Sequence, residues 1–375
     1  MKTPRIVDAL GQIDDALLTE AMTDRPKKAK TPAWVKWTAV AACICLCVVS
    51  VFTVLRPGMG RTVFYHPVTQ GDDIYYTDAH SNAYHWNPSM EKPEALGRTG
   101  RFYATEAGPV LYADQDQQLL LAEGDGLSFL GTAEIEGLLS DPELIGIQAN
   151  AVYWAGTPLK QSQANGGTCI LKTTFSDDTA QYLLSLEEDS LLTHTLRGDK
   201  LYYQMSCGNG TAEELRVLDT VTLQDTLLAE LPVDQTSGMA ARSYFGADDI
   251  VLVDLYQPGL WTLSYEGGTP ERLAQVAPYN HAMAEQDGVL YFATSFRENQ
   301  IQPLPSELKE AGEAVISVDL DTGTLHGIFS LEEGNGTIRY TVTELAMGTH
   351  GLYFADPQQG LYYHSFADGT DTRIQ

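Results

Sequence analysis

The stretch GLYFAD at residues 351–356 decides the fold, because close variants of it return along the chain. Each copy has a turn residue, an aliphatic residue, two mostly aromatic residues and then a small or polar one. The gaps between the central residues of successive copies are 37, 41, 49, 49, 40 and 62 residues. Repeats of this length are typical of propeller blades or helical hairpins. The central residues are Tyr75, Tyr112, Tyr153, Tyr202, Val251, Tyr291 and Tyr353.

The repeated stretches are predicted to be strands. Each is short, rich in aromatic and β-branched residues, and bounded by Gly, Asp or Asn. Successive side chains on a strand point to opposite faces, so Tyr75 and Tyr76 cannot share a face. A strand that is apolar on both faces must be covered on both. This pattern favours a blade packed between two neighbouring blades over a sandwich with one wet face.

The remainder of each unit supplies further strands, such as residues 259–265 followed by 271–276, and residues 314–320 followed by 324–331. Residues 62–375 shared among seven copies give about 45 residues per unit, the usual size of a four-stranded blade. We predict an all-β fold, a seven-bladed β-propeller, with six or eight blades as alternatives because the fifth copy is weak. The last unit ends one strand short, and residues 61–68 are predicted to supply that strand and close the ring.

A long apolar segment precedes the repeats. No charged side chain occurs from Trp37 to Leu55, and 19 helical residues span roughly 28 Å, close to the thickness of a bilayer core. A cleaved signal peptide would lie nearer the N-terminus. A lipoprotein signal at Cys43 is disfavoured because the apolar run continues beyond it. The sequence therefore predicts a cytoplasmic tail at 1–32, a transmembrane helix at 33–56 and an extracellular propeller at 57–375.

Charge sets the orientation and excludes some partners. The chain carries 23 Lys and Arg against 50 Asp and Glu, a net charge of −27. Nucleic acid is disfavoured as a partner, because phosphates need a basic face. Basic residues crowd the N-terminal side of the apolar segment, which places the N-terminus in the cytoplasm by the positive-inside rule. The predicted location is the cell membrane, single-pass, with the C-terminal domain outside. The basic residues are Arg25, Lys27, Lys28, Lys30 and Lys36.

The tail contains one amphipathic pattern. Residues 6–22 place apolar side chains at helical spacing, which predicts a short helix. Such a helix is marginal alone. It is interpreted either as a docking helix for a cytoplasmic partner or as a loosely folded tail.

The LYF and IYY repeats resemble those of the TolB-like propellers common in Gram-positive Firmicutes. The head, with residues 6–22 followed by basic residues and WVKWTAVAACICLCVV (34–49), resembles the membrane anchor of many clostridial surface proteins. In some of those proteins the arrangement resembles an anti-sigma factor with an external sensor. The resemblance implies a single-pass anchored protein with a propeller outside the cell.

No catalytic or metal motif is evident. The histidines are scattered, and neither a His-Glu-x-x-His spacing nor a Gly-x-Ser-x-Gly elbow occurs. Cys43, Cys45 and Cys47 lie in the apolar segment. Cys169 and Cys207 lie outside it, and a disulfide between them is left open, because spacing alone cannot prove proximity. We predict no cofactor and no metal.

Two insertions, residues 157–168 and 295–313, lengthen the third and sixth repeats, and long loops on a rigid ring often carry binding residues. Tyr153, Arg297 and Glu298 are the candidate binding residues. The leading hypothesis is a non-enzymatic binding or sensing protein that presents a ring face to an extracellular protein or cell-wall ligand. The alternatives are a glycan- or peptide-processing surface enzyme that uses channel carboxylates, and an assembly scaffold.

Overall fold

The computed structural model describes residues 65–375 with interruptions at 134, 160–166, 176–179, 187–189, 207–211, 235–238, 241, 255–258, 277, 281, 297–311 and 333–337. The chain divides into a unit Met1–Gly60 and a compact unit Arg61–Gln375. The predicted tail, its helix and the predicted transmembrane helix at 33–56 lie outside the described residues. Among the residues described, no helix is long and apolar enough to span a membrane.

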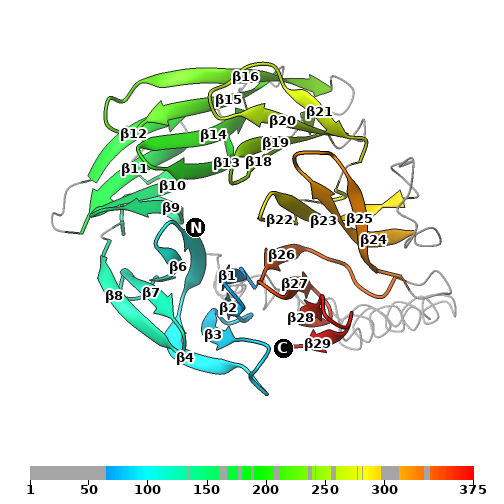
Figure 1. Cartoon of the computed structure of the whole chain (residues 1–375). Coiled ribbons are helices and arrows are strands. Elements are labelled where there is room, and N and C mark those ends of the chain that lie inside the picture. The colour runs from blue at the N-terminus through cyan, green and yellow to red at the C-terminus, as the bar shows by residue number, and fades with distance from the viewer. Residues whose placement is uncertain are drawn as a thin grey trace, which may run out of the picture. The chain divides into compact units, whose positions relative to one another are not determined.

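The described part is all-β and forms a seven-bladed propeller, which confirms the predicted fold class. Seven antiparallel sheets stand in a ring, with β1, β9, β13, β18, β22 and β26 nearest its centre (Figure 1). Blades 1 to 3 consist of β1 (Val68–Gln70), β2 (Asp73–Thr77), β3 (Asn82–Trp86) and β4 (Glu94–Thr99); β5 (Arg101–Thr105), β6 (Gly108–Ala113), β7 (Gln118–Glu123) and β8 (Gly126–Thr132); and β9 (Leu139–Gln148), β10 (Ala151–Pro158), β11 (Thr168–Thr174) and β12 (Ala180–Leu186).

The fourth sheet has five strands and the others have four. Blade 4 consists of β13 (Ser190–Arg197), β14 (Lys200–Ser206), β15 (Ala212–Asp219), β16 (Asp225–Asp234) and β17 (Met239–Ala240). Blades 5 to 7 consist of β18 (Arg242–Phe245), β19 (Asp249–Asp254), β20 (Gly259–Ser264) and β21 (Glu271–Ala274); β22 (Met283–Gln286), β23 (Val289–Ser295), β24 (Glu313–Asp319) and β25 (Leu325–Ser330); and β26 (Glu344–Met347), β27 (Gly351–Asp356), β28 (Gly360–Ser365) and β29 (Asp371–Arg373).

The repeated aromatic stretches are the second strands of the blades, and both of their faces are covered. Tyr75 and Tyr76 in β2 are each 0% exposed. Tyr75 packs in one cluster with Phe102 of blade 2, whereas Tyr76 packs in another with Tyr353 of blade 7. Adjacent residues of one strand therefore contact opposite neighbours, and burial of both faces explains why no polar alternation is present.

The ring is not closed by strand exchange, so that prediction is wrong. β1 pairs with β2 of its own blade, and blade 7 completes itself with β29. Side chains join the two blades instead. The Tyr353 hydroxyl donates to the Asp72 carbonyl oxygen at 2.6 Å, and the rings of Trp86 and Tyr363 lie 5.7 Å apart. The C-terminal residues 371–373 supply the fourth strand of blade 7, so that blade needs no strand from the start of the ring.

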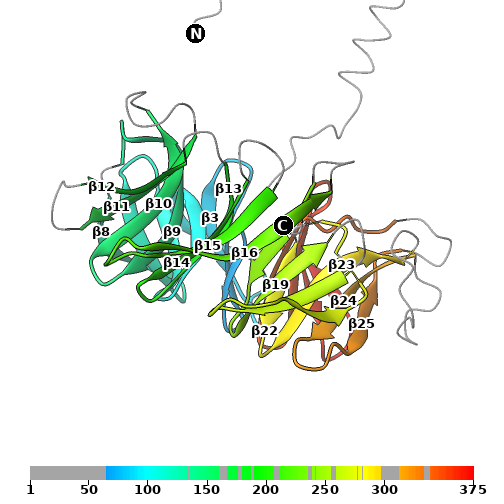
Figure 2. The ribbon, with the colours of Figure 1, turned by 90° about the horizontal axis from the view of Figure 1, so that it is seen from above.

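The strand order defines two ends of the ring. Each blade alternates strand direction, and the chain passes from the outer strand of one blade to the innermost strand of the next. All innermost strands therefore start at the same end, which we call the entry end. The connection from the second to the third strand also lies there, and both insertions are connections of this kind, β10–β11 and β23–β24. Figure 2 shows the blades in a view turned by 90°.

The Asp321-Thr322-Gly323 turn of blade 6 contacts blade 5, and a substitution in it can measure how tightly the two blades pack. Gly323 has φ +69°, and an added Cβ would lie 2.3 Å from the carbonyl oxygen of Leu273 in blade 5. Gly124 also has positive φ, +55°, but an added Cβ there would meet nothing within 4 Å. Both Ala substitutions carry a backbone cost, and only Gly323→Ala adds a clash with rigid backbone. We expect Gly323→Ala to lower the free energy of unfolding by about 1–3 kcal/mol more than Gly124→Ala in urea denaturation. Equal losses would contradict the tight blade 5–blade 6 contact.

Candidate functional site

A group of ionisable side chains, which we call the channel cluster, lies around the centre of the ring. Its members come from five blades, and each lies on an innermost strand or directly before one. Such strands line the centre of a propeller. Their mutual electrostatic effects and contacts show that they lie close together. The channel cluster consists of His66, Arg101, Glu143, His194 and Glu344.

Glu344, the first residue of β26, connects blade 7 to the start of blade 1. Its carboxylate accepts the backbone N–H groups of Tyr65 at 2.7 Å and His66 at 3.0 Å. The His66 ring lies beside it, with Nδ1 at 3.8 Å from Oε1. Burial raises the pKa of Glu344, and the two backbone donors oppose that rise. Glu344 therefore holds the chain in place at Tyr65 and His66, just before the first strand of blade 1.

Arg101, the first residue of β5, is an exposed cation near the other members of the cluster. It forms no ion pair within 4 Å among the described residues. Its charge favours the ionised forms of Glu143 and Glu344. Burial, with the charge of Arg101 adding to it, lowers the pKa of His66 to about 4. His66 is therefore neutral at pH 7.

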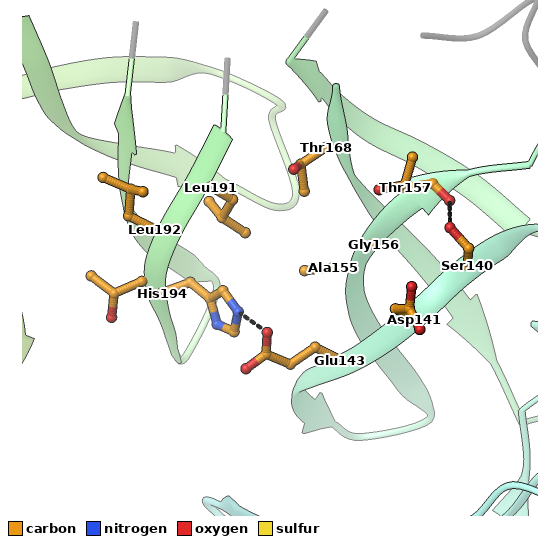
Figure 3. A pocket seen from close by; sticks show the side chains of 11 residues that line it. Ser140, Asp141, Glu143, Ala155, Gly156, Thr157, Thr168, Leu191, Leu192 and His194 are labelled. Atoms are coloured by element: carbon orange, nitrogen blue, oxygen red, sulfur yellow. Dashed lines mark hydrogen bonds and ion pairs between the residues drawn. The ribbon is translucent and has the colours of Figure 1, made fainter. Parts of the chain in front are cut away.

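Glu143 and His194 form a carboxylate–imidazole pair between blades 3 and 4. Nε2 of His194 lies 3.6 Å from Oε2 of Glu143 (Figure 3). The interaction with His194 holds the pKa of the Glu143 carboxyl below its usual value. The imidazole is 11% exposed and the carboxylate 58% exposed. The contact of the His194 ring with Glu143 is made through Nε2, and Nδ1 has no hydrogen-bond partner in the part of the chain that the structure describes.

Two cavities flank β13 and share His194. Cavity A, about 320 Å³, lies between β9, β10 and β13, and its charged lining residues are Asp141 and Glu143. Cavity B, about 490 Å³, lies between β13, β18 and β22, and Arg242 is its charged lining residue. Leu191, Leu192 and Thr193 line both. An imidazole thus lies between an acidic cavity and a basic one.

A buried polar network stands behind cavity B. Glu213 is 6% exposed and lies 3.9 Å from Nη1 of Arg242. Glu213 also accepts a hydrogen bond from Nε2 of Gln204, whose Oε1 accepts the backbone N–H of Ser243 at 2.7 Å. The Ser243 hydroxyl is buried without a hydrogen-bond partner among the described residues. The network therefore holds the backbone next to Arg242 in place, while the Ser243 hydroxyl has no hydrogen-bond partner among the described residues.

The residues predicted for binding do not form this site. Tyr153 is 1% exposed in the core between blades 3 and 4, and its hydroxyl contacts Gln148 at 3.3 Å and Thr220 at 3.4 Å. It lines neither cavity A nor cavity B. Arg297 and Glu298 lie outside the described residues, and their role stays a prediction. Cys169 is a buried free thiol, so the disulfide considered with Cys207 is not formed; Cys207 itself lies outside the described residues.

Sequence reasoning missed the channel cluster, although a weak pattern was present. Each member precedes the central residue of its repeat by eight to eleven positions: His66 before Tyr75, Arg101 before Tyr112, Glu143 before Tyr153, His194 before Tyr202 and Glu344 before Tyr353. Ionisable residues at this place in an otherwise apolar ring could have been noticed once the repeats were aligned.

The low pKa of His66 predicts how the stability of the folded chain depends on pH. Its pKa is about 4 in the folded chain and 6.5 in the reference state, so the unfolded chain binds the proton more readily. His66 then contributes stability that is present above pH 6.5 and is lost as pH falls from 6.5 towards 4. We expect His66→Gln to remove part of the decline of the thermal midpoint over this range. Parallel declines of the thermal midpoint for wild type and His66→Gln would refute the role of His66. His80→Gln, on an exposed turn, is the control.

Comparisons with known proteins identify the fold. No family model matches the chain, and no curated protein matches its sequence. Among solved structures, a puromycin-hydrolyzing peptidase from Mycobacterium tuberculosis is 13% identical with a TM-score of 0.53, covering 84% of this chain and 52% of that one. A prolyl endopeptidase structure is 12% identical with a TM-score of 0.50, covering 92% and 55%. The chain thus spans about half the length of these peptidases.

A further solved structure matches over nearly its whole length. An oligogalacturonate lyase in complex with manganese is 9% identical with a TM-score of 0.54, covering 81% of this chain and 90% of that one. These neighbouring structures are of enzymes. They contradict the predicted non-enzymatic binding and sensing role, which we correct here. At these identities the likeness itself shows the propeller fold alone.

Manganese in the lyase raises the question of a metal here. Among the described residues, no group of three or more His, Cys, Asp or Glu side chains could hold a metal ion. The channel cluster does not supply such a group, because Glu344 is occupied by backbone N–H groups. The residues do not fit the metal, and we derive no step through one.

Proposed function

We propose that the protein is an enzyme that cleaves saccharide chains in its central channel, with His194 and Glu143 as the acid–base pair. The observation that carries the proposal is the placement of this pair between cavities A and B, with Nδ1 of His194 unpartnered among the described residues. The match to the lyase over 90% of its length supports it, because a single propeller accounts for nearly all of that enzyme.

The pair can take up and return a proton without a further side chain. Nε2 of His194 faces the Glu143 carboxylate at 3.6 Å, so a proton held on Nε2 would leave Nδ1 as the basic nitrogen of the neutral ring. When Nδ1 takes a proton, the adjacent carboxylate stabilises the imidazolium. The same nitrogen can return the proton to a leaving oxygen. A loose contact of 3.6 Å is compatible with this role, since such contacts often shorten when a ligand binds.

The test is a cleavage screen with the full chain on neutral and acidic oligosaccharides and on short peptides. New reducing ends with the short-wavelength ultraviolet absorbance of a double bond conjugated to a carboxylate indicate elimination, and reducing ends alone indicate hydrolysis. The proposal requires one of these two results with the wild-type protein. The same activity should be lost in the His194→Gln variant. Release of peptide amines without saccharide cleavage would favour the peptide-processing alternative, since the peptidases match 84% and 92% of this chain.

We also propose that residues 33–56 anchor the protein in the cell membrane, with residues 57–375 outside and residues 6–22 available to a cytoplasmic partner. The proposal rests on the apolar segment, its basic N-terminal flank and the resemblance to clostridial anchors and TolB-like propellers. Deleting residues 38–55 should release the protein from the membrane fraction. Retention of the deleted form there would refute the anchor.

A further inference from the structure

We infer that cavity B binds the carboxylate of an acidic saccharide through Arg242, with the neighbouring sugar unit in cavity A. The inference rests on the proposed function, since it names the substrate class of the same site. It is carried by the charges of the two cavities and by the buried support of Arg242.

The charges of the cavities are opposite. Arg242 is the charged residue of cavity B, whereas Asp141 and Glu143 line cavity A. The chain as a whole carries −27, so a basic cavity runs against the composition. An anionic group entering the channel meets attraction in cavity B and repulsion in cavity A. Sugar hydroxyls, as donors, suit the carboxylates of cavity A.

Arg242 has donors to spare. A guanidinium carries five N–H donors, and the described contact of Arg242 is the one with Glu213 at 3.9 Å, longer than a hydrogen bond. Its side chain is 26% exposed. Glu213 therefore holds the guanidinium by charge without using its donors. A carboxylate is the planar acceptor that a guanidinium binds through two parallel hydrogen bonds.

The surroundings of Arg242 form a built site. Glu213 and Gln204 are 6% and 0% exposed, and they fix the backbone of Ser243 next to Arg242. Ser243 lines the same cavity, and its hydroxyl is buried without a partner among the described residues.

His194 lines both cavities, so a bond between sugar units placed in the two cavities would lie beside it. This placement links recognition to the proposed chemistry. The carboxylate in cavity B fixes which unit lies on which side of His194. A neutral sugar would lose that orientation because cavity B would offer it no charge to pair with.

The test compares galacturonate with galactose by titration calorimetry on the full chain. The two sugars differ only in the carboxylate, and binding needs no turnover. We expect galacturonate to bind more tightly by about 10–100-fold, as for a charged hydrogen-bonded contact. The double variant Arg242→Gln with Glu213→Gln should lose this preference. It removes both charges, so no buried carboxylate is left unpaired. Glu213→Gln alone should keep the preference, and Arg98→Gln, on a surface pair with Asp116, is the control.

Equal binding of the two sugars, no binding of either, or a preference that survives the double variant would overturn the inference. An acetylated dipeptide and its amide form the second arm: preference for the free acid through Arg242, without galacturonate binding, would assign the site to peptide carboxylates instead. If galacturonate binds through Arg242 but no saccharide is cleaved, the inference stands and the proposed function fails. If neutral saccharides are cleaved as well as acidic ones, the proposed function stands and the inference fails.

Discussion

Replacing Glu143 with Gln is expected to lower kcat on the cleaved saccharide by about 10²–10⁴-fold, the usual contribution of a positioned acid–base group. The amide cannot stabilise a protonated His194, and it can present its NH₂ group to Nε2, which would favour the wrong tautomer. Because the Glu143 side chain is 58% exposed, the variant should fold with an unchanged thermal midpoint. The loss should fall mainly on kcat and less on KM, because Asp141 remains in cavity A to accept from the sugar hydroxyls.

The measurement is steady-state kinetics across pH on wild type, Glu143→Gln and His194→Gln. Because the two residues act as one unit, the double variant should be hardly slower than either single variant. Glu266→Gln is the control: this side chain is 84% exposed and pairs only at the surface with Lys200. A variant of Glu143 with wild-type kcat would remove the pair from the mechanism.

Tyr353→Ala is expected to be the most destabilising of the substitutions considered, at about 3–5 kcal/mol, the cost of deleting a large aromatic side chain from a core. Tyr353 is 0% exposed. Its ring lies 5.0 Å from that of Tyr363 and 6.1 Å from that of Trp86 in blade 1. Since no strand of the described chain joins blades 7 and 1, these contacts and the hydroxyl contribute to closing the ring, together with the contacts of Glu344 and the hydrogen bond from His350 to Asp72.

Urea denaturation of the full chain measures this effect, and Tyr353→Phe is the matched variant. Phenylalanine keeps the ring and loses only the hydrogen bond to Asp72, so its cost should be about 0.5–1.5 kcal/mol. A loss below about 1 kcal/mol for Tyr353→Ala would mean that closure depends on other contacts, such as those of Glu344 with Tyr65 and His66.

The sequence by itself determined the identity of the second strands and favoured seven blades over the alternatives of six or eight. The repeats from Tyr75 to Tyr353 are periodic and local, and an aromatic strand apolar on both faces can be buried only between two neighbours. The assignment of the weak fifth copy as a second strand was also correct, because Val251 lies in β19 of blade 5 and is 0% exposed. Strand identity depends on a few adjacent residues, so it can be predicted without knowledge of the ring.

The tertiary structure alone decided how the ring closes and which side chains meet at its centre. His66 and Glu344 are 278 residues apart in sequence and are brought together only because blade 7 lies beside blade 1. Tyr153 illustrates the converse: an aromatic residue beside an insertion was predicted to bind, yet neighbouring blades cover both faces of its strand, and Tyr153 is buried in the core like the adjacent Trp154. The place of a channel residue in its repeat is only a weak pattern, and the sequence does not show which side chains it meets, because its neighbours come from other blades.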